Sequence, residues 1–319
     1  MKKILGILCI GVSLGLSAQN WKVLETPTET TARSENSIVA IGSKIYLFGG
    51  RGMKPMEVYD TKTNTWETRG ALPLEIHHFQ AATYNGEIYV AGALSGPFPH
   101  EIPIPNIYIY NPDKDEWRKG DEIPRKRGAA GCFVYRDKIY VVNGIQDGHW
   151  DGHVSWFDEY DPKTGDWREL PDSPHPRDHI NVGMVKSKLV VAAGRRSNFK
   201  EDDAFSLVSP YTDIYDFKTN VWTTVIDQDI PTRRAGIGAV TLGNKVYFIG
   251  GEGPAQKEAH DQVEAFNVKT MSWEIMPKLN QGRHGIGATK VGKNIYVSSG
   301  VSVRGGRPEL NSMECLGCK

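Results

Sequence analysis

The sequence predicts an all-β protein in which six similar blades form a propeller. Two observations support this fold class. An apolar run that ends in small residues recurs six times, and an aromatic strand followed by a tryptophan comes after every copy but the last. Self-similarity at a period of about 40 to 50 residues is typical of propeller blades, each of which contains four strands. We therefore expect six sheets around one axis.

The repeated run is clearest at residues 45–50, which read Ile-Tyr-Leu-Phe-Gly-Gly. Such a run predicts a buried strand, and its closing small residues allow a sharp turn or a close backbone approach. The second residue of the run falls at positions 46, 89, 140, 190, 247 and 296, so the steps are 43, 51, 50, 57 and 49 residues.

The second repeated feature is a strand with a central aromatic residue, followed by a tryptophan. The pairs are Tyr59 and Trp66, Tyr110 and Trp117, Tyr160 and Trp167, Tyr215 and Trp222, and Phe266 and Trp273. In these residues the chain resembles the Kelch family, whose blades carry a glycine doublet, then Tyr or Phe, then Trp. The resemblance implies a six-bladed Kelch β-propeller, and it leaves the function open.

The last blade has no tryptophan-bearing outer strand at the C-terminal end of the chain. Residues 20–24 (Asn-Trp-Lys-Val-Leu) resemble the outer strands around Trp66 and Trp167. We therefore expect the N-terminal strand to complete blade six, which leaves no free sheet edge between the first and last blades.

The N-terminus has the pattern of a signal peptide over residues 1–18: two lysines, an apolar stretch, then small residues. The apolar stretch is shorter than the ~20 residues that span a bilayer. We expect a single propeller domain at 19–319, located in the periplasm or secreted, monomeric and without membrane insertion. The 38 basic and 38 acidic residues cancel, which argues against nucleic acid as a partner. Cys315 and Cys318 have metal or redox spacing, and we interpret them as a strand cysteine and a frayed tail.

Strand alternation places two kinds of segment on one face: those that enter the inner strands and the long loops after the apolar runs. Long loops on a rigid scaffold commonly bind ligands. Thirteen residues before the second residue of the run, five of six copies have arginine, and the second copy has Ile76. The predicted substrate-binding residues are Arg33, Arg127, Arg177, Arg195, Arg234, Arg283 and Trp150. Guanidinium groups suit carboxylate or sulfate ligands; the alternative is that each arginine pairs with a nearby acid or with loop carbonyls.

His179, His78 and His284 are the predicted catalytic residues, because each lies in a segment that enters an inner strand. A carboxylate held by arginine makes the adjacent C–H easier to ionise, and a histidine can take that proton. His149 and His153, with Asp147 and Asp151, have loose metal-ligand spacing but no helix to hold it. We expect no metal and no other cofactor.

Three functions remain open. The first is an exported lyase or dehydratase that acts on uronate-containing oligo- or polysaccharides by β-elimination. The second is a mutarotase or epimerase of an acidic sugar such as sialic acid. The third is a non-catalytic propeller that binds glycans or proteins. Resemblance to exported bacterial propellers that act on acidic sugars implies an acidic carbohydrate as the partner.

Overall fold

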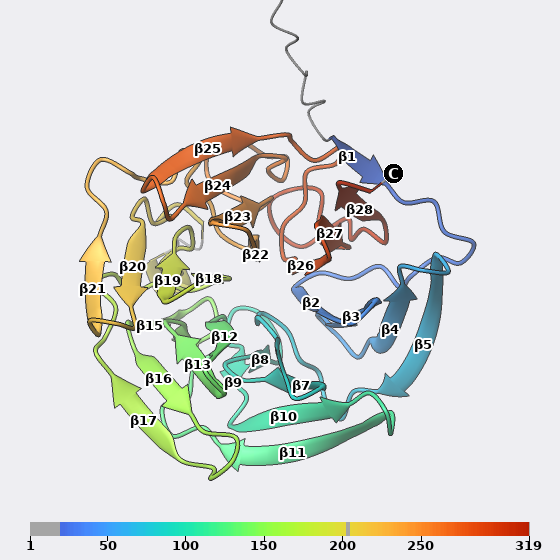
Figure 1. Cartoon of the computed structure of the whole chain (residues 1–319), viewed down its shortest axis with the longest axis horizontal. Helices are drawn as coiled ribbons and strands as arrows, with labels where there is room; N and C mark the ends of the chain where they lie inside the picture. The colour runs from blue at the N-terminus through green and yellow to red at the C-terminus, as the bar shows by residue number, and fades with distance from the viewer. Residues whose placement is uncertain (1–19, 202–204, 319) are drawn as a thin grey trace, which may run out of the picture.

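The computed structural model describes residues 20–201 and 205–318. Figure 1 shows six antiparallel sheets in a ring, each with its first strand near the centre and its last strand at the rim. This arrangement confirms the predicted all-β, six-bladed propeller. The signal peptide expected at residues 1–18 lies outside the described residues.

Each blade contains four strands, numbered below in order from the axis to the rim. Blade one consists of β2 (Asn36–Ile41), β3 (Lys44–Gly49), β4 (Pro55–Asp60) and β5 (Thr65–Ala71). Blade two consists of β6 (Ala82–Tyr84), β7 (Glu87–Val90), β10 (Asn106–Asn111) and β11 (Glu116–Glu122). Blade three consists of β12 (Gly131–Tyr135), β13 (Lys138–Val142), β16 (Phe157–Tyr160) and β17 (Trp167–Leu170).

The second half of the ring repeats this plan. Blade four consists of β18 (Gly183–Val185), β19 (Lys188–Val191), β20 (Asp213–Asp216) and β21 (Val221–Thr224). Blade five consists of β22 (Gly238–Leu242), β23 (Lys245–Ile249), β24 (Val263–Asn267) and β25 (Ser272–Met276). Blade six consists of β26 (Ala288–Val291), β27 (Asn294–Ser298), β28 (Met313–Leu316) and β1 (Trp21–Val23).

The N-terminal strand closes the ring as the sequence predicts. β1 pairs with β28, with Trp21 opposite Leu316, and the Trp21 indole N–H donates to the carbonyl of Pro277 at 2.9 Å. Cys315, in β28, forms a disulfide with Cys318, two residues after the end of that strand. The expectation of a frayed tail is therefore wrong, because the second cysteine is bonded back to the strand.

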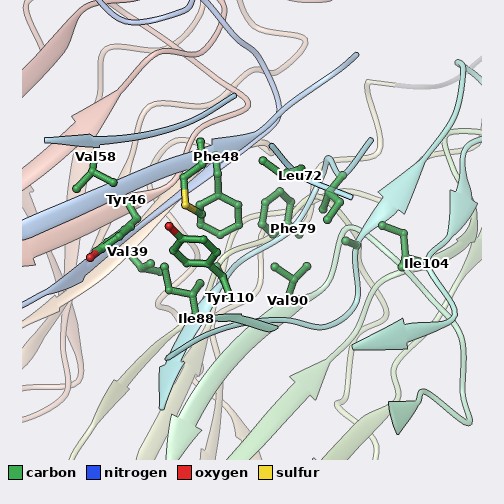
Figure 2. Packing of buried hydrophobic residues seen from close by; sticks show 14 residues of the cluster. Val39, Tyr46, Phe48, Val58, Leu72, Phe79, Ile88, Val90, Ile104 and Tyr110 are labelled. Atoms are coloured by element: carbon green, nitrogen blue, oxygen red, sulfur yellow. The ribbon is translucent and has the colours of Figure 1, made fainter. Parts of the chain in front are cut away.

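The hydrophobic core is divided among the interfaces between neighbouring blades. Figure 2 shows one such cluster, in which Phe48 of blade one packs against Phe79 at the entrance to blade two, with ring centroids 5.4 Å apart. Within each of the first five blades, the third-strand aromatic residue also contacts the outer-strand tryptophan, as Tyr59 does Trp66 at 5.2 Å. Burial of each such aromatic side chain is worth about 1.5 to 3 kcal/mol.

The long loops extend from one face of the ring, which we call the loop face. Two of them form hairpins, β8 (Leu94–Ser95) with β9 (Ile102–Pro103) and β14 (Ile145–Asp147) with β15 (Asp151–His153). Another contains the 3-10 helix η1 (Phe199–Glu201). Isolated bridges join the segments that enter the inner strands to these loops, for example His77 to Leu94 and His284 to Val301. No helix among the described residues is long and apolar enough to cross a membrane.

The final glycine of the repeated run brings the loop and the entering segment into contact. A Cβ on Gly50, where φ is +115°, would lie 2.7 Å from the carbonyl oxygen of Ser34, and one on Gly251 would lie 2.9 Å from that of Ala235. Only glycine fits there, because both the conformation and the space exclude a side chain.

Candidate functional site

The five arginines that recur between blades lie inside the blades and do not face the loop-face opening. Each is 0 % exposed and forms an ion pair with an acid on the third strand of its own blade. The pairs are Arg33 with Glu57, Arg127 with Asp158, Arg177 with Asp213, Arg234 with Glu264, and Arg283 with Glu314. Burial lowers the pKa of these guanidinium groups, and the paired carboxylates counteract that effect.

The same arginines also hold the end of the repeated run. Each donates to the carbonyl of the residue sixteen positions later, as Arg33 does to Gly49 at 3.0 Å and Arg283 to Ser299 at 2.9 Å. Blade two has Ile76 in place of arginine and Tyr108 in place of the acid. Because both charges are absent together, the pair is a structural unit of the blade. The sequence contains this correlation, and it is the signal that could identify these acids as the arginines' partners.

The residue two positions after each of these arginines, or after Ile76, lines a small cavity shared by the six blades. These six residues are Glu35, His78, Ala129, His179, Gly236 and Gly285, and all have positive φ, between 51° and 66°. Backbone hydrogen bonds link neighbours in this ring, such as His78 N–H to Glu35 O at 3.1 Å and Gly285 N–H to Gly236 O at 2.8 Å. We call this set the axial ring.

The axial ring explains where His179 points. Strand alternation predicts Arg177 and His179 on the same side of an extended segment. Instead, the left-handed conformation at His179, where φ is 54°, turns its side chain toward its histidine neighbours while Arg177 enters the blade. Arg177 therefore cannot hold a ligand beside His179.

Three buried histidines converge beside the axial ring: His78, His149 and His179. Their rings are 4.5 to 5.2 Å apart between centroids. The Nε2 atoms of His149 and His179 are 3.0 Å apart. Two residues predicted to be catalytic, His78 and His179, therefore lie close together, and the β14–β15 turn contributes His149 to the same cluster. We call these three residues the histidine triad.

Carboxylates orient two members of the triad from behind. The Nδ1 atom of His149 lies 2.9 Å from Glu101 Oε1, and that of His179 is hydrogen-bonded to Asp178. Burial alone would raise the pKa of both carboxyl groups, yet both pKa values are lowered. Hydrogen bonds from His149 and Arg51 lower that of Glu101. A hydrogen bond from His179 and the positive charge of Arg195 lower that of Asp178. Burial followed by the nearby positive charge of Arg195 lowers the pKa of His179 to about 3.

The remaining predicted site residues are separate from the triad. The Nε2 atom of His284 lies 2.9 Å from Val303 O and 2.8 Å from Gly305 O, in the last loop. Arg195 is 1 % exposed and donates to Glu252 at 2.6 Å. Trp150 is half-buried, with its ring 4.6 Å from that of His100. Arg195 is thus held in a buried ion pair, and Trp150 packs against the ring of His100.

The loop set with metal-ligand spacing does not assemble. Asp147 lies 3.1 Å from His100, and His149 turns to the triad. Among residues 20–201 and 205–318, only the histidine triad brings three potential ligand atoms within 4.8 Å of one another. The sequence could not reveal this grouping, because its members come from three blades.

A pocket of about 760 Å³ opens on the loop face above the axial ring, and all six blades contribute to it. Its wall includes Glu35 and His149, which connect it to the axial ring and the triad, and the exposed Phe98. The full lining is Ser34, Glu35, Arg51, Gly52, Lys54, Phe98, His149, Phe205, Glu252, His284, Gly305, Gly306, Arg307 and Glu309.

Comparison with known families and proteins supports the repeat assignment. Residues 12–253 match the Attractin/LZTR1 β-propeller family, and residues 233–280 match the Kelch motif. The chain is 26 % identical to Kelch-like protein terF of Aspergillus terreus over 291 residues, which is 86 % of this chain and 62 % of that protein. It is 28 % identical to Kelch-like protein 25 of Xenopus tropicalis over 231 residues, which is 69 % of this chain and 37 % of that protein.

The chain therefore spans less than two thirds of the length of these relatives. Among solved structures, it is similar to one titled "Structure of YjhT", with a TM-score of 0.76 and 18 % identity over 90 % of this chain and 95 % of that one. At this identity the likeness establishes the fold alone. These matches support a Kelch-type propeller and give no support to the expected resemblance to acidic-sugar enzymes or to bacterial export.

Proposed function

The chain belongs to the Attractin/LZTR1 β-propeller family, and we propose that it is a non-catalytic propeller that binds a segment of a partner protein at its loop face. The observation that carries the proposal is the pocket of about 760 Å³ to which all six blades contribute. Its relatives are Kelch-like proteins, and Kelch propellers generally bind proteins. A pocket walled by loops on a rigid ring is suited to recognition because the loops can vary without loss of the fold.

The pocket's chemistry favours a peptide segment over a small apolar ligand. Phe98 is 46 % exposed, and its ring packs against His149 at 5.0 Å between centroids. Acidic and basic groups share the rest of the wall, with Glu35 on one side and the exposed Arg307 on the other. An aromatic anchor surrounded by charges of both signs is typical of a protein interface.

A photo-crosslinking amino acid placed at Phe98 tests the proposal. The matched control places it at Ile275, which is 72 % exposed on the outer strand β25, far from the pocket lining. We expect a crosslinked partner at position 98 but not at position 275. We also expect the substitution Arg307→Glu to abolish the crosslink at position 98. Purified partner must then bind the unmodified protein at a one-to-one ratio. The same crosslinks from both positions, or none from position 98, would rule out this function.

An acidic carbohydrate is the second candidate ligand. The pocket wall includes three basic residues, Arg51, Lys54 and Arg307, together with His149 and His284. Arg51 and Lys54 already pair with Glu101 and Glu309, which leaves Arg307 to contact a carboxylate. A lyase or dehydratase would convert uronate oligosaccharides to a product with new ultraviolet absorbance, whereas a mutarotase would change the optical rotation of sialic acid. Binding without either change would indicate a glycan-binding propeller.

We also propose that the protein is exported to the periplasm or the cell exterior. The Cys315–Cys318 disulfide supports an oxidising location, because cytosolic thiols are normally kept reduced. Fractionation of the producing cells, with a mass measurement of the mature N-terminus, tests this. An intact N-terminus at Met1 in the cytosolic fraction would contradict it.

A further inference from the structure

The histidine triad has hydrogen-bond partners on one side of its rings and lacks them on the other. His149 and His179 each direct Nδ1 to a carboxylate. Those carboxylates accept further hydrogen bonds: Glu101 from Arg51, and Asp178 from the Ser197 backbone N–H at 2.9 Å. Since an ionised carboxylate can only accept, Nδ1 carries the proton on both imidazoles.

The same reasoning fixes the tautomer of His78. His77 Nε2 lies 3.1 Å from Gly96 O, which can only accept, so His77 donates from Nε2 and its Nδ1 is an acceptor. His78 Nδ1, 2.7 Å from that atom, must then be the donor. The Nε2 atom of His78 is left with a lone pair, and it is buried without a hydrogen-bond partner.

Each of the three buried triad histidines therefore carries its lone pair on Nε2. Those of His149 and His179 face each other at 3.0 Å with no proton between them in these tautomers. Two facing acceptors repel, and a buried acceptor without a partner loses the hydrogen bond that water would supply. A positive species between the rings removes this repulsion: either a metal ion, or a proton that one of the two imidazoles takes up at Nε2 and donates to the other.

We infer that His78, His149 and His179 bind one divalent transition metal ion of the zinc class through their Nε2 atoms. Neutral imidazole nitrogen suits zinc, copper, nickel and iron, while magnesium and calcium prefer oxygen. In a tetrahedral zinc site with Zn–N distances of about 2.0 Å, ligand nitrogens lie about 3.3 Å apart. One ring nitrogen from each triad histidine lies within 4.8 Å of the others, and the Nε2 atoms of His149 and His179 are 3.0 Å apart, so the cluster is of this size.

The surroundings of the triad match those of known three-histidine sites. Metal-bound histidines usually donate their other N–H to a carboxylate or carbonyl, which fixes the ring, and Glu101 and Asp178 accept these bonds in the triad. Three protein ligands leave a coordination position for water or a ligand. Glu35, whose carboxylate is 3.3 Å from His78 Nε2, lines the pocket next to the triad. The inference stands independently of the proposed protein-binding function.

Metal uptake by the intact chain tests the inference directly. Protein freed of metal by a chelator is titrated with Zn²⁺ and separately with Co²⁺, and bound metal is measured by elemental analysis. We expect one ion per chain and the intense visible absorption of four-coordinate Co²⁺. The paramagnetic NMR spectrum of the Co²⁺ form should show three exchangeable, strongly shifted protons, one Nδ1–H from each imidazole. Fewer than three would overturn the assigned ligand set, even if variants failed to fold.

Variants locate the ion. Asp178→Asn, which changes the hydrogen-bond acceptor behind His179 and leaves the three histidines in place, should weaken Zn²⁺ binding about 10- to 100-fold, and His179→Ala should weaken it further. His100→Ala is the matched control, because His100 is exposed on the same face and contacts Asp147; its affinity should equal that of the wild type. Absence of uptake, or unchanged uptake when all three triad histidines are replaced by alanine, would overturn the inference.

Discussion

The buried arginines and the histidine triad are both polar groups near the axis of the propeller, yet they differ in whether their hydrogen bonds are satisfied. Arg283 is 0 % exposed and donates to Ser299, Ser312 and Glu314. The triad is similarly buried, but His78 Nε2 has no hydrogen-bond partner and two more Nε2 lone pairs face each other. A complete set of partners marks a structural group, because nothing remains for a ligand to bind.

The comparison also explains why recurrence in sequence is a poor guide to function in a repeat protein. The buried arginine–acid pair is present in five of the six blades, and in each it joins the third strand to the end of the repeated run. The triad has no repeat: it draws His78 and His179 from the axial ring and His149 from a loop. The proposed metal site therefore lies where the blades differ.

The largest effect should come from breaking one buried ion pair. Arg283→Ala leaves Glu314 charged and buried, and the loss of one partner from such a pair typically costs about 3 to 5 kcal/mol. Chemical denaturation should show this loss in the free energy of unfolding. Arg307→Ala, which removes an exposed arginine of blade six, is the control and should change it by less than about 0.5 kcal/mol.

A double variant separates lost charge from lost packing. Arg283→Ile with Glu314→Tyr reproduces the residues that blade two has at Ile76 and Tyr108. It should be more stable than Arg283→Ala, because no uncompensated charge remains. If the double variant were the less stable of the two, the ion pair would not be the cause of the loss.

Glu252, on the pocket wall between the two regions, should make stability fall in acid. Burial opposes ionisation, but the positive charges of His284 and Arg195 and a hydrogen bond from Gly305 lower its pKa from 4.5 to about 2. A carboxylate with a depressed pKa stabilises the fold above its unfolded pKa and loses that contribution as the pH falls from 4.5 toward 2. The shift corresponds to about 3 kcal/mol.

The measurement compares the free energy of unfolding between pH 5 and pH 2.5 in the wild type and in Glu252→Gln. Because the variant lacks the titrating group, the wild type should lose more stability than the variant over this interval. Parallel pH curves would show that the pair with Arg195 does not depend on the charge of Glu252.

The smallest effect should come from the triad in metal-free protein. His149→Ala removes one of the facing acceptors, while Glu101 keeps its ion pair with Arg51. We expect the free energy of unfolding to change by less than about 1 kcal/mol, since lost packing is offset by relief of the repulsion between lone pairs. A loss as large as that of Arg283→Ala would place His149 with the structural groups and would remove the contrast between the two regions.

The all-β class, the six blades, their phase and the closing strand could all be predicted from the sequence, because each depends on local periodicity. The alternation of apolar residues, the glycine at the end of each run and the aromatic–tryptophan pairs act within one blade, so spacing along the chain reports them. Trp21 could be assigned for the same reason, because the sequence of an outer strand is recognisable even at the opposite end of the chain from the rest of its blade.

Which polar residues are free to bind a ligand could be learned only from the folded structure. The arginines recur at the same position of the repeat in five of the six blades. Whether a guanidinium group faces a ligand or an acid depends on the direction of its side chain, and the positive φ of the axial-ring residues changes the chain direction there. His78, His149 and His179 lie up to 101 residues apart in sequence (179 − 78), and no spacing rule connects them. Their meeting follows from ring closure, which brings the entrances of all six blades to one axis.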